Sequence, residues 1–156
     1  MSQKLLKKQG GFTLLELLIV IVIIGILALI IVPGLASGPK RARDAQRKSD
    51  MRAVKNALET YYTDNNGYPY VAGTAQAAYT GLSPFLTPDP LKTMPVDPKN
   101  SGSYVYQYLP YATSGSTTAC SAFPCASYAL DATLENTKDS QIKSGTTDTY
   151  EVTSVN

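Results

Sequence analysis

Residues 10–16 read Gly-Gly-Phe-Thr-Leu-Leu-Glu, and the apolar run that opens with Phe12 continues to Leu35. Glu16 is the one acidic residue in this run. A carboxylate placed in hydrocarbon costs about 2.5–3.5 kcal/mol on insertion scales unless it faces a partner. A segment that served only as an anchor has no use for such a residue. The sequence therefore predicts that Glu16 meets an opposite charge.

The segment 12–36 is predicted to cross a membrane. The stretch Leu17–Val32 is unbroken and apolar, and a spanning helix needs about 20 residues. Lysines 4, 7 and 8 precede it and none follows immediately. By the positive-inside rule this places the N-terminus in the cytoplasm and the bulk of the chain outside.

Two cleavage positions are open. Gly34-Leu35-Ala36 fits the small-x-small pattern of signal peptidase, although the apolar run is longer than a usual signal peptide allows. A cut after Gly11 instead keeps the whole apolar segment on the mature chain and frees an α-amine on Phe12. Because helix positions i and i+4 share a face, this amine and Glu16 lie in one region. An axially displaced neighbour can then pair its amine with the carboxylate, which would set the register.

This segment resembles the class III signal sequence of type IV pilins and type II secretion pseudopilins. The resemblance implies that a prepilin peptidase cuts between Gly11 and Phe12 and N-methylates Phe12. It also implies that Glu16 contacts the Phe12 amine of an adjacent subunit during assembly. The matching positions are Lys8, Gly11, Phe12, Thr13, Leu14 and Glu16.

Two helix-breaking residues interrupt the apolar segment, Gly25 and Pro33. In the pilin family, the part of the helix between these positions can melt as the subunit enters the filament. The resemblance therefore implies an extensible stretch from Gly25 to Pro33. An ordinary kink is the alternative, since both residue types are common in membrane helices.

A second helix is predicted from Lys40 to Asp64, after a further break at Gly38-Pro39. Asn66-Gly67 predicts its end. Residues 64–67 also read as a fragment of a calcium loop, but the later ligands are missing and the capping interpretation is preferred. One apolar stripe is expected along this helix, formed by Ala45, Met51, Val54, Leu58 and Tyr61.

The residues after Pro69 predict a loop-rich head with about three antiparallel strands. Alternating side chains mark the strands at 104–108, 128–134 and, more weakly, 150–152. Leu82, Phe85 and Leu86 are expected to form a helical turn that packs on the second helix. The predicted fold is α+β: a long, kinked N-terminal helix with the sheet packed on its second half, as in type IV pilins. The expected segments are a leader at 1–11, an assembly and membrane half at 12–36, an amphipathic half at 37–66 and a head at 67–156.

The resemblance extends into the head, where it is closest to major pseudopilins and Gram-positive-type pilins. It rests on residues 43–50, 57–59, 61–62 and 66–69. The strings Pro95-Val96-Asp97-Pro98 and Tyr128–Glu135 add to it. Major pseudopilins also bind calcium in a head loop, but those ligands have no residue-by-residue match here, so no metal site is assigned.

The chain has two cysteines, Cys120 and Cys125, and no histidine, which excludes an ordinary four-ligand zinc site. In an exported domain this spacing favours a short disulfide loop, with two free thiols as the alternative. The loop at 113–124 departs most from the pseudopilin pattern. We hypothesise that its disulfide replaces a metal as the staple of the head.

Charge divides the chain into a basic stem and an acidic head. From Lys40 to Lys55 there are seven basic and two acidic residues, and beyond Lys55 there are four lysines and nine acids. This asymmetry favours association of head with stem. It also permits a second hypothesis, nucleic-acid binding through phosphate contacts. The basic residues in question are Lys40, Arg41, Arg43, Arg47, Lys48 and Arg52.

Nothing in the sequence supports catalysis, because there is no histidine base, no phosphate loop and no activated nucleophile. The first hypothesis is a structural subunit of an extracellular type IV pilus-like filament. The alternatives are the major pseudopilin of a type II secretion system and a DNA-uptake filament. A monomeric membrane-anchored domain would leave Glu16 unexplained.

The resemblance also implies the partners and the location. The partners are other copies of the chain in a helical polymer, the prepilin peptidase, and the inner-membrane assembly platform with its assembly ATPase. The location is a single-pass membrane position before assembly. After assembly it is a surface pilus or a periplasmic pseudopilus.

Overall fold

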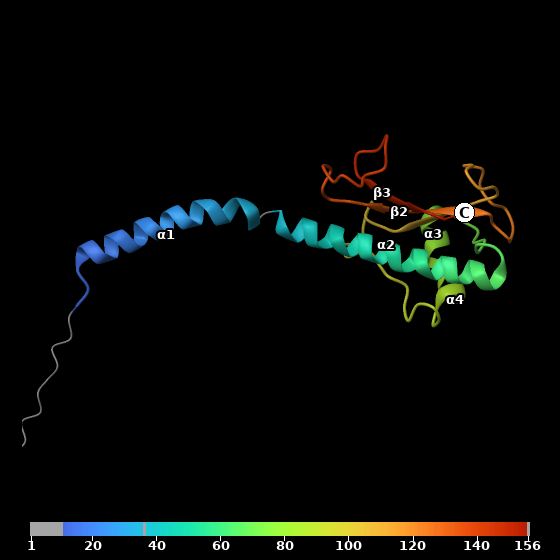
Figure 1. The fold of residues 1–156 in the computed structure, drawn as a ribbon, viewed down its shortest axis with the longest axis horizontal. Coiled ribbons are helices and arrows are strands. Elements are labelled where there is room, and N and C mark those ends of the chain that lie inside the picture. Colours follow the sequence, from blue (N-terminus) through green and yellow to red (C-terminus); the bar gives the residue numbers. More distant parts are fainter. Residues whose placement is uncertain (1–10, 36, 156) are drawn as a thin grey trace, which may run out of the picture. The chain divides into compact units, whose positions relative to one another are not determined.

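The computed structural model describes residues 11–35 and 37–155, and of residues 30–35 it describes the backbone alone. Within these residues the elements follow the order α1, α2, α3, α4, β1, β2, β3 (Figure 1). The chain divides between Pro39 and Lys40 into two compact units. The α+β class predicted from the sequence is confirmed.

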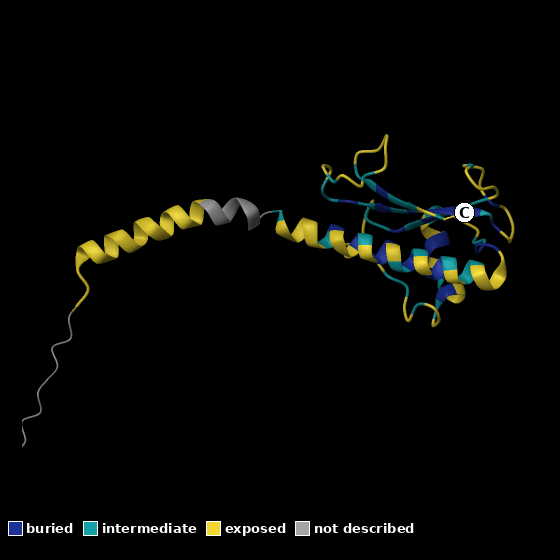
Figure 2. Cartoon of the chain, in the orientation of Figure 1, coloured by how far each residue is buried: buried dark blue, intermediate teal, exposed yellow. Residues whose placement is uncertain are grey.

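Helix α1 spans Leu14–Leu35, and its apolar side chains from Leu14 to Leu29 are largely exposed. From Leu14 to Leu29 the large aliphatic side chains are between 48% and 88% exposed (Figure 2). In the part of the chain that the structure describes, no helix has both the length and the hydropathy that a membrane crossing requires. The predicted membrane span at 12–36 is therefore not confirmed.

Helix α1 continues through Gly25 and Pro33 and ends at Leu35. A glycine costs a helix about 1 kcal/mol, which is too little to end one flanked by aliphatic helix formers. Pro33 lies in the last turn, where only two further helical residues follow it. Melting of this stretch on assembly stays a prediction.

Helix α2 spans Gly38–Asn65, and the first half of its buried face is charged. Three residues of the predicted stripe, Met51, Val54 and Leu58, are fully buried as expected. Ala45 is exposed, which corrects the expected stripe. The reason is that the buried face begins with ion-paired side chains instead of aliphatic ones; these are Asp44, Arg47 and Asp50.

The predicted end of α2 is confirmed at Asn66. This residue has a φ of 55°, and its N–H donates to the Tyr62 carbonyl at 2.7 Å. A left-handed residue directly after the last turn is a common helix stop. Gly67 follows because a Cβ there would lie 2.3 Å from the Cβ of Pro124, so only glycine lets the disulfide loop approach.

Two short helices follow. Helix α3 spans Ala75–Thr80, where the sequence predicted only loop, and the side chain of Thr74 caps it by accepting from the Ala77 N–H. Helix α4 spans Ser83–Leu86, which confirms the expected helical turn. The Phe85 ring meets Tyr61 of α2 edge-on, with 6.0 Å between ring centroids.

The three strands form one antiparallel sheet in the order β1-β2-β3, as predicted. They span Gln107–Tyr111, Ser127–Thr133 and Thr149–Thr153. The first strand begins later than the Tyr104 expected from alternation, because the Tyr104 N–H closes a turn onto the Ser101 carbonyl. Pro110 is tolerated in β1 because that strand lies at the sheet edge.

The core lies between α2 and the sheet and is rich in tyrosine. A buried phenol needs a hydrogen-bond partner, and five of these hydroxyls donate to one: those of Tyr68, Tyr79, Tyr106, Tyr108 and Tyr128. The hydroxyls of Tyr68 and Tyr128 both donate to the Glu59 carboxylate, at 2.8 and 3.0 Å. Tyr106 donates to Asp50 at 2.7 Å. The head is therefore fixed to α2 by polar bonds inside an apolar core.

Candidate functional site

The start of α1 is closed by a reciprocal pair of bonds between Thr13 and Glu16. The backbone N–H of Glu16 donates to Oγ1 of Thr13 at 3.2 Å. The backbone N–H and the hydroxyl of Thr13 both donate to Oε2 of Glu16, each at 2.9 Å. Threonine followed three residues later by glutamate is the capping-box signature, and it satisfies donors that the first helical turn leaves open.

This geometry gives Glu16 a partner that sequence reasoning missed. We expected its carboxylate to be paired by another subunit, and the structure adds a local role as the helix cap. The spacing Thr-x-x-Glu at a helix start was the available signal. Both bonds to the side chain end on Oε2. The contact between Glu16 and the Phe12 amine of a neighbour stays a prediction.

The predicted cleavage site precedes the helix. Gly11 and Phe12 lie outside α1, and Phe12 is 92% exposed. A peptide bond in an exposed, non-helical segment is accessible to a protease. The leader residues 1–10 lie outside the described residues, as does Ala36 of the alternative cleavage position. Cleavage after Gly11 and methylation of Phe12 stay predictions.

Three of the six basic residues proposed for nucleic-acid contact are engaged inside the head. Arg43 donates to both carboxylate oxygens of Glu135, at 2.5 and 2.7 Å. Lys48 pairs with Asp139 at 2.6 Å and lies over the Tyr150 ring. The pairing of stem with head that the charge asymmetry suggested therefore forms within one chain.

Arg47 is the centre of this ion cluster, and its side chain has no exposed surface. Its guanidinium donates to Asp97 at 2.7 and 3.1 Å, to Asp44 at 2.8 Å and to Glu135 at 3.1 Å. The Tyr104 ring lies 4.9 Å away on one face. A buried arginine is not available to phosphate, which corrects its assignment to a surface.

The cluster shifts the acid–base behaviour of its members. Burial lowers the pKa of Arg47, but the hydrogen bonds to Asp97, Glu135 and Asp44 outweigh it, and the net pKa is raised. The hydrogen bond from Arg43 holds the pKa of Glu135 well below its ordinary value. Burial raises the pKa of Asp97, but the bond from Arg47 reverses the shift and leaves it lowered. All three groups therefore stay charged at neutral pH.

Asp44 joins the cluster to the end of the sheet. Its two carboxylate oxygens accept the backbone N–H groups of Glu135 and Asn136, each at 2.9 Å. Sequence reasoning did not identify Asp44, Asp97 or Glu135 as partners. The strings that contain Asp97 and Glu135 contributed to the family resemblance, but spacing gives no sign that they meet on Arg47.

The remaining basic residues of this group, Lys40, Arg41 and Arg52, are exposed on α2. No ion pair found in residues 37–155 involves them. The six predicted contact residues are thus divided between an internal cluster and a free surface. The nucleic-acid hypothesis therefore loses three of its six proposed contact residues.

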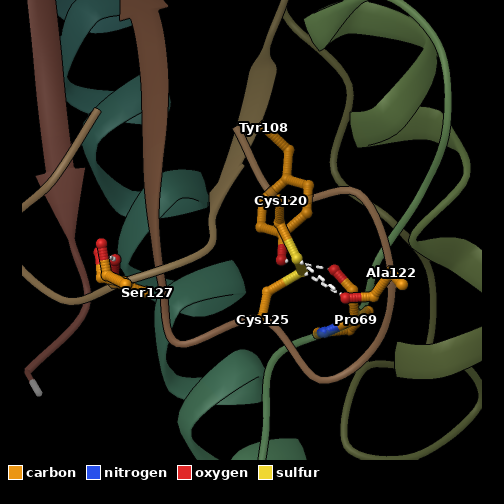
Figure 3. Close-up of a disulfide and its surroundings, with 7 residues drawn as sticks. Pro69, Tyr108, Cys120, Ala122, Cys125 and Ser127 are labelled. Carbon is orange, nitrogen blue, oxygen red and sulfur yellow. Dashed lines mark hydrogen bonds between the residues drawn. A yellow bond between two sulfur atoms is a disulfide. The ribbon is translucent and has the colours of Figure 1, made fainter. Parts of the chain in front are cut away.

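The disulfide between Cys120 and Cys125 is present, as predicted. It lies beside the ring of Tyr108, whose hydroxyl donates to the Pro69 carbonyl at 2.8 Å (Figure 3). Tyr68 and Cys125 exchange two backbone hydrogen bonds, at 3.0 and 3.2 Å. The disulfide loop is thereby tied to the segment that follows α2.

Among residues 11–35 and 37–155, no group of three or more histidine, cysteine, aspartate or glutamate side chains is arranged to hold a metal. Asp64 and the residues after it form the helix end described above. No calcium site is assigned.

Comparison with known proteins identifies both the N-terminal segment and the head. Residues 6–32 match the prokaryotic N-terminal methylation motif. The type II secretion system core protein G of Pseudomonas aeruginosa is 38% identical over 117 residues, which cover 70% of this chain and 79% of that protein. No solved structure gives a significant match to the chain.

Proteins of the same name from two other bacteria are similar over a comparable length. The relative from Vibrio cholerae is 37% identical over 114 residues, covering 68% of this chain and 74% of its own. The relative from Aeromonas hydrophila is 39% identical over 100 residues, covering 59% and 68%. The similarity thus reaches well beyond the methylation motif.

Proposed function

This chain belongs to the family of type II secretion system core protein G, and from that premise we propose that it is the structural subunit of a secretion pseudopilus. The observation that carries the proposal is similarity over most of the length of those relatives. A shared methylation motif alone would fit any pilin-like protein.

We now prefer the pseudopilus to the surface pilus. The sequence analysis placed the surface pilus first and the pseudopilus second. The relatives carry the name of a secretion component, which favours the pseudopilus. Their name also supports a structural role for this chain rather than a catalytic one.

Polymerisation would cover the exposed surface of α1. A helix with apolar side chains on every face needs a membrane or other protein around it. We propose that α1 lies in the inner membrane before assembly and among the α1 helices of neighbours afterwards. The head would then lie on the periplasmic side and cover the filament, and the assembly platform and its ATPase would drive the transfer.

Glu16 would act in two steps. Within one subunit, its bonds with Thr13 hold the carboxylate at the start of α1. After a prepilin peptidase cuts behind Gly11, the methylated amine of Phe12 on a neighbour would pair with this oriented carboxylate. Removal of the leader would therefore switch on assembly, because the amine does not exist before the cut.

The test is Glu16→Gln, compared with Thr13→Val, in cells that carry the secretion machinery. Gln keeps the size and loses the charge, so we expect at least a tenfold loss of filaments and of exported protein. Thr13→Val removes the hydroxyl of the cap and leaves the charge, so we expect a smaller loss. Normal filament yield and export in the Gln variant would refute the charge-pairing role.

Two further measurements separate the alternatives. N-terminal sequencing should place the mature start at Phe12, and a start near Ser37 would support signal-peptidase cleavage instead. Deletion of the gene should abolish protein export while leaving surface motility and DNA uptake intact. The opposite pattern would restore the surface-pilus hypothesis.

A further inference from the structure

A groove of about 190 Å³ lies at the C-terminal end of α2, between that helix and the segment after α4. Two of its lining residues are aromatic, Tyr61 and Phe85, and their rings meet edge-on. Two are carboxylates, Asp64 and Asp89, and both are exposed. The rest of the lining is Thr60, Asn65 and Pro90.

The two carboxylates of this groove have no cation of their own. No ion pair found in residues 37–155 involves Asp64 or Asp89. Carboxylates beside aromatic rings match one side chain above all, because guanidinium donates in a planar fork and also stacks on rings. The groove therefore fits an arginine.

The same chain carries unpaired guanidinium groups, on Arg41 and Arg52. They lie eleven positions apart, which is about three turns, so they share one face of α2. Ala45 and Ser49 lie between them and are exposed. Small side chains between two arginines let another surface come close. We refer to Arg41, Ala45, Ser49 and Arg52 as the arginine face.

The arginine face cannot reach the groove of its own chain. Arg52 and Asp64 are twelve residues apart on one helix, which is about 18 Å along the axis. Arg41 is about 35 Å from Asp64 by the same rise per residue. The groove and the face therefore point to contact between two copies, one offset along the axis from the other.

We propose that the groove of each subunit receives Arg41 or Arg52 of a neighbouring copy in the filament. The proposal rests on the proposed function and adds the contact by which the heads are held in register. Arg41 lies near the start of α2 and Asp64 near its end, so one contact can repeat from subunit to subunit. The chain's own free arginines, rather than another protein, supply the complementary charge.

Cysteine cross-linking in assembled filaments tests this contact. Both native cysteines are held in a disulfide, so introduced thiols have no native competitor. We expect D89C combined with R52C, or D89C combined with R41C, to give a ladder of covalent oligomers on mild oxidation. The control combines D89C with K138C, which is exposed elsewhere on the head and should give none.

The outcomes separate this contact from filament formation itself. Filaments of normal yield in which neither arginine position cross-links would overturn the contact alone. A ladder of equal strength in the Lys138 control, or cross-linking to a different protein, would overturn it as well. If the unaltered chain forms no filament, both the proposed function and the contact fail.

A charge exchange gives an independent readout. We expect R41E/R52E to lower filament yield at least fivefold. Adding D64K and D89K to this variant should recover most of the yield, because the exchanged charges again attract. A variant with all four changes that stays as poor as R41E/R52E would count against the contact.

Discussion

The guanidinium of Arg47 meets the carboxylate of Asp97 through two hydrogen bonds, and neither side chain has any exposed surface. The two residues are fifty positions apart in the sequence. Their contact joins the first half of α2 to the loop before the sheet. Burial of a charge in this way is costly unless every partner is present.

Removal of Arg47 should therefore destabilise the head strongly. Arg47→Met leaves Asp44, Asp97 and Glu135 without their shared cation. Loss of one partner from a buried ion pair costs about 3–5 kcal/mol. Urea unfolding of the detergent-solubilised chain, followed by tyrosine near-ultraviolet circular dichroism, measures this. All eleven tyrosines lie beyond residue 60 and there is no tryptophan, so the signal reports on the head and on the end of α2.

Arg52→Met is the matched control for that substitution. Arg52 is on the same helix and exposed, so its loss should change the stability by less than about 0.5 kcal/mol. Equal stability of the two variants would show that the Arg47 cluster contributes nothing to the free energy of unfolding of the head.

Acid should weaken the head through the same cluster. The pKa values of Glu135 and Asp97 are lowered in the folded chain from ordinary values of 4.5 and 3.8. Their contribution is complete above those values and is lost as the pH falls below them, because the unfolded chain takes up protons first. We expect the urea midpoint to fall from about pH 5 downward.

Glu135→Gln checks the source of that acid sensitivity. This variant should be less stable than the unaltered chain at pH 7 and should lose less stability between pH 5 and pH 3. An identical pH profile in both proteins would assign the acid effect to other groups.

The effect of Asp131 on stability should change with pH in the opposite direction to that of Glu135 and Asp97. One of its oxygens is buried without a hydrogen-bond partner among the described residues. Burial and the charge of Glu151 raise the pKa of Asp131 above 3.8, although Lys143 partly opposes them. Because the ionised form is disfavoured in the fold, its penalty grows as the pH rises. Asp131→Asn should stabilise the head at pH 7 by roughly 1 kcal/mol.

The gain from Asp131→Asn should disappear near pH 3, where the aspartate of the unaltered chain is protonated in both states. Urea titrations at pH 7 and pH 3 give the comparison. A gain of equal size at both values would mean that charge is not its cause.

The disulfide should contribute a modest part of the stability. Cys120 and Cys125 close a short loop, with a sequence separation of five. Loop-closure entropy for such a length corresponds to about 2 kcal/mol. The double variant Cys120→Ala/Cys125→Ala should lose about this much in urea unfolding. If it loses nothing, the backbone pairing of Tyr68 with Cys125 holds the loop without the bond.

Sequence reasoning succeeded where the signal was local. Asn66 and Gly67 marked the end of α2, and alternation in residues 128–134 marked the central strand. The apolar positions Met51, Val54 and Leu58 gave the buried face of the second half of α2. Each of these follows from residues a few positions apart.

Sequence reasoning failed where the interacting residues are far apart in the chain or where the helix is short. A row of charges at the start of α2 reads as a solvated face, and only Asp97 and Glu135, far along the chain, make it an interior one. For this reason the sequence analysis placed Ala45 in the buried apolar stripe, although it is exposed. Helix α3 is six residues long, and its Thr74 cap lies in a sequence dense in glycine and alanine that carries no helical period.

The cluster around Arg47 also makes the head sensitive to incomplete folding. Three separate regions of the chain, ending at Glu135, must arrive before the guanidinium is satisfied. A head that lacks the last of them would leave this cluster with unpaired charge, and we expect it to be cut by proteases faster than the complete head. Resistance of the head to proteolysis would therefore depend on contacts that form only when folding is complete.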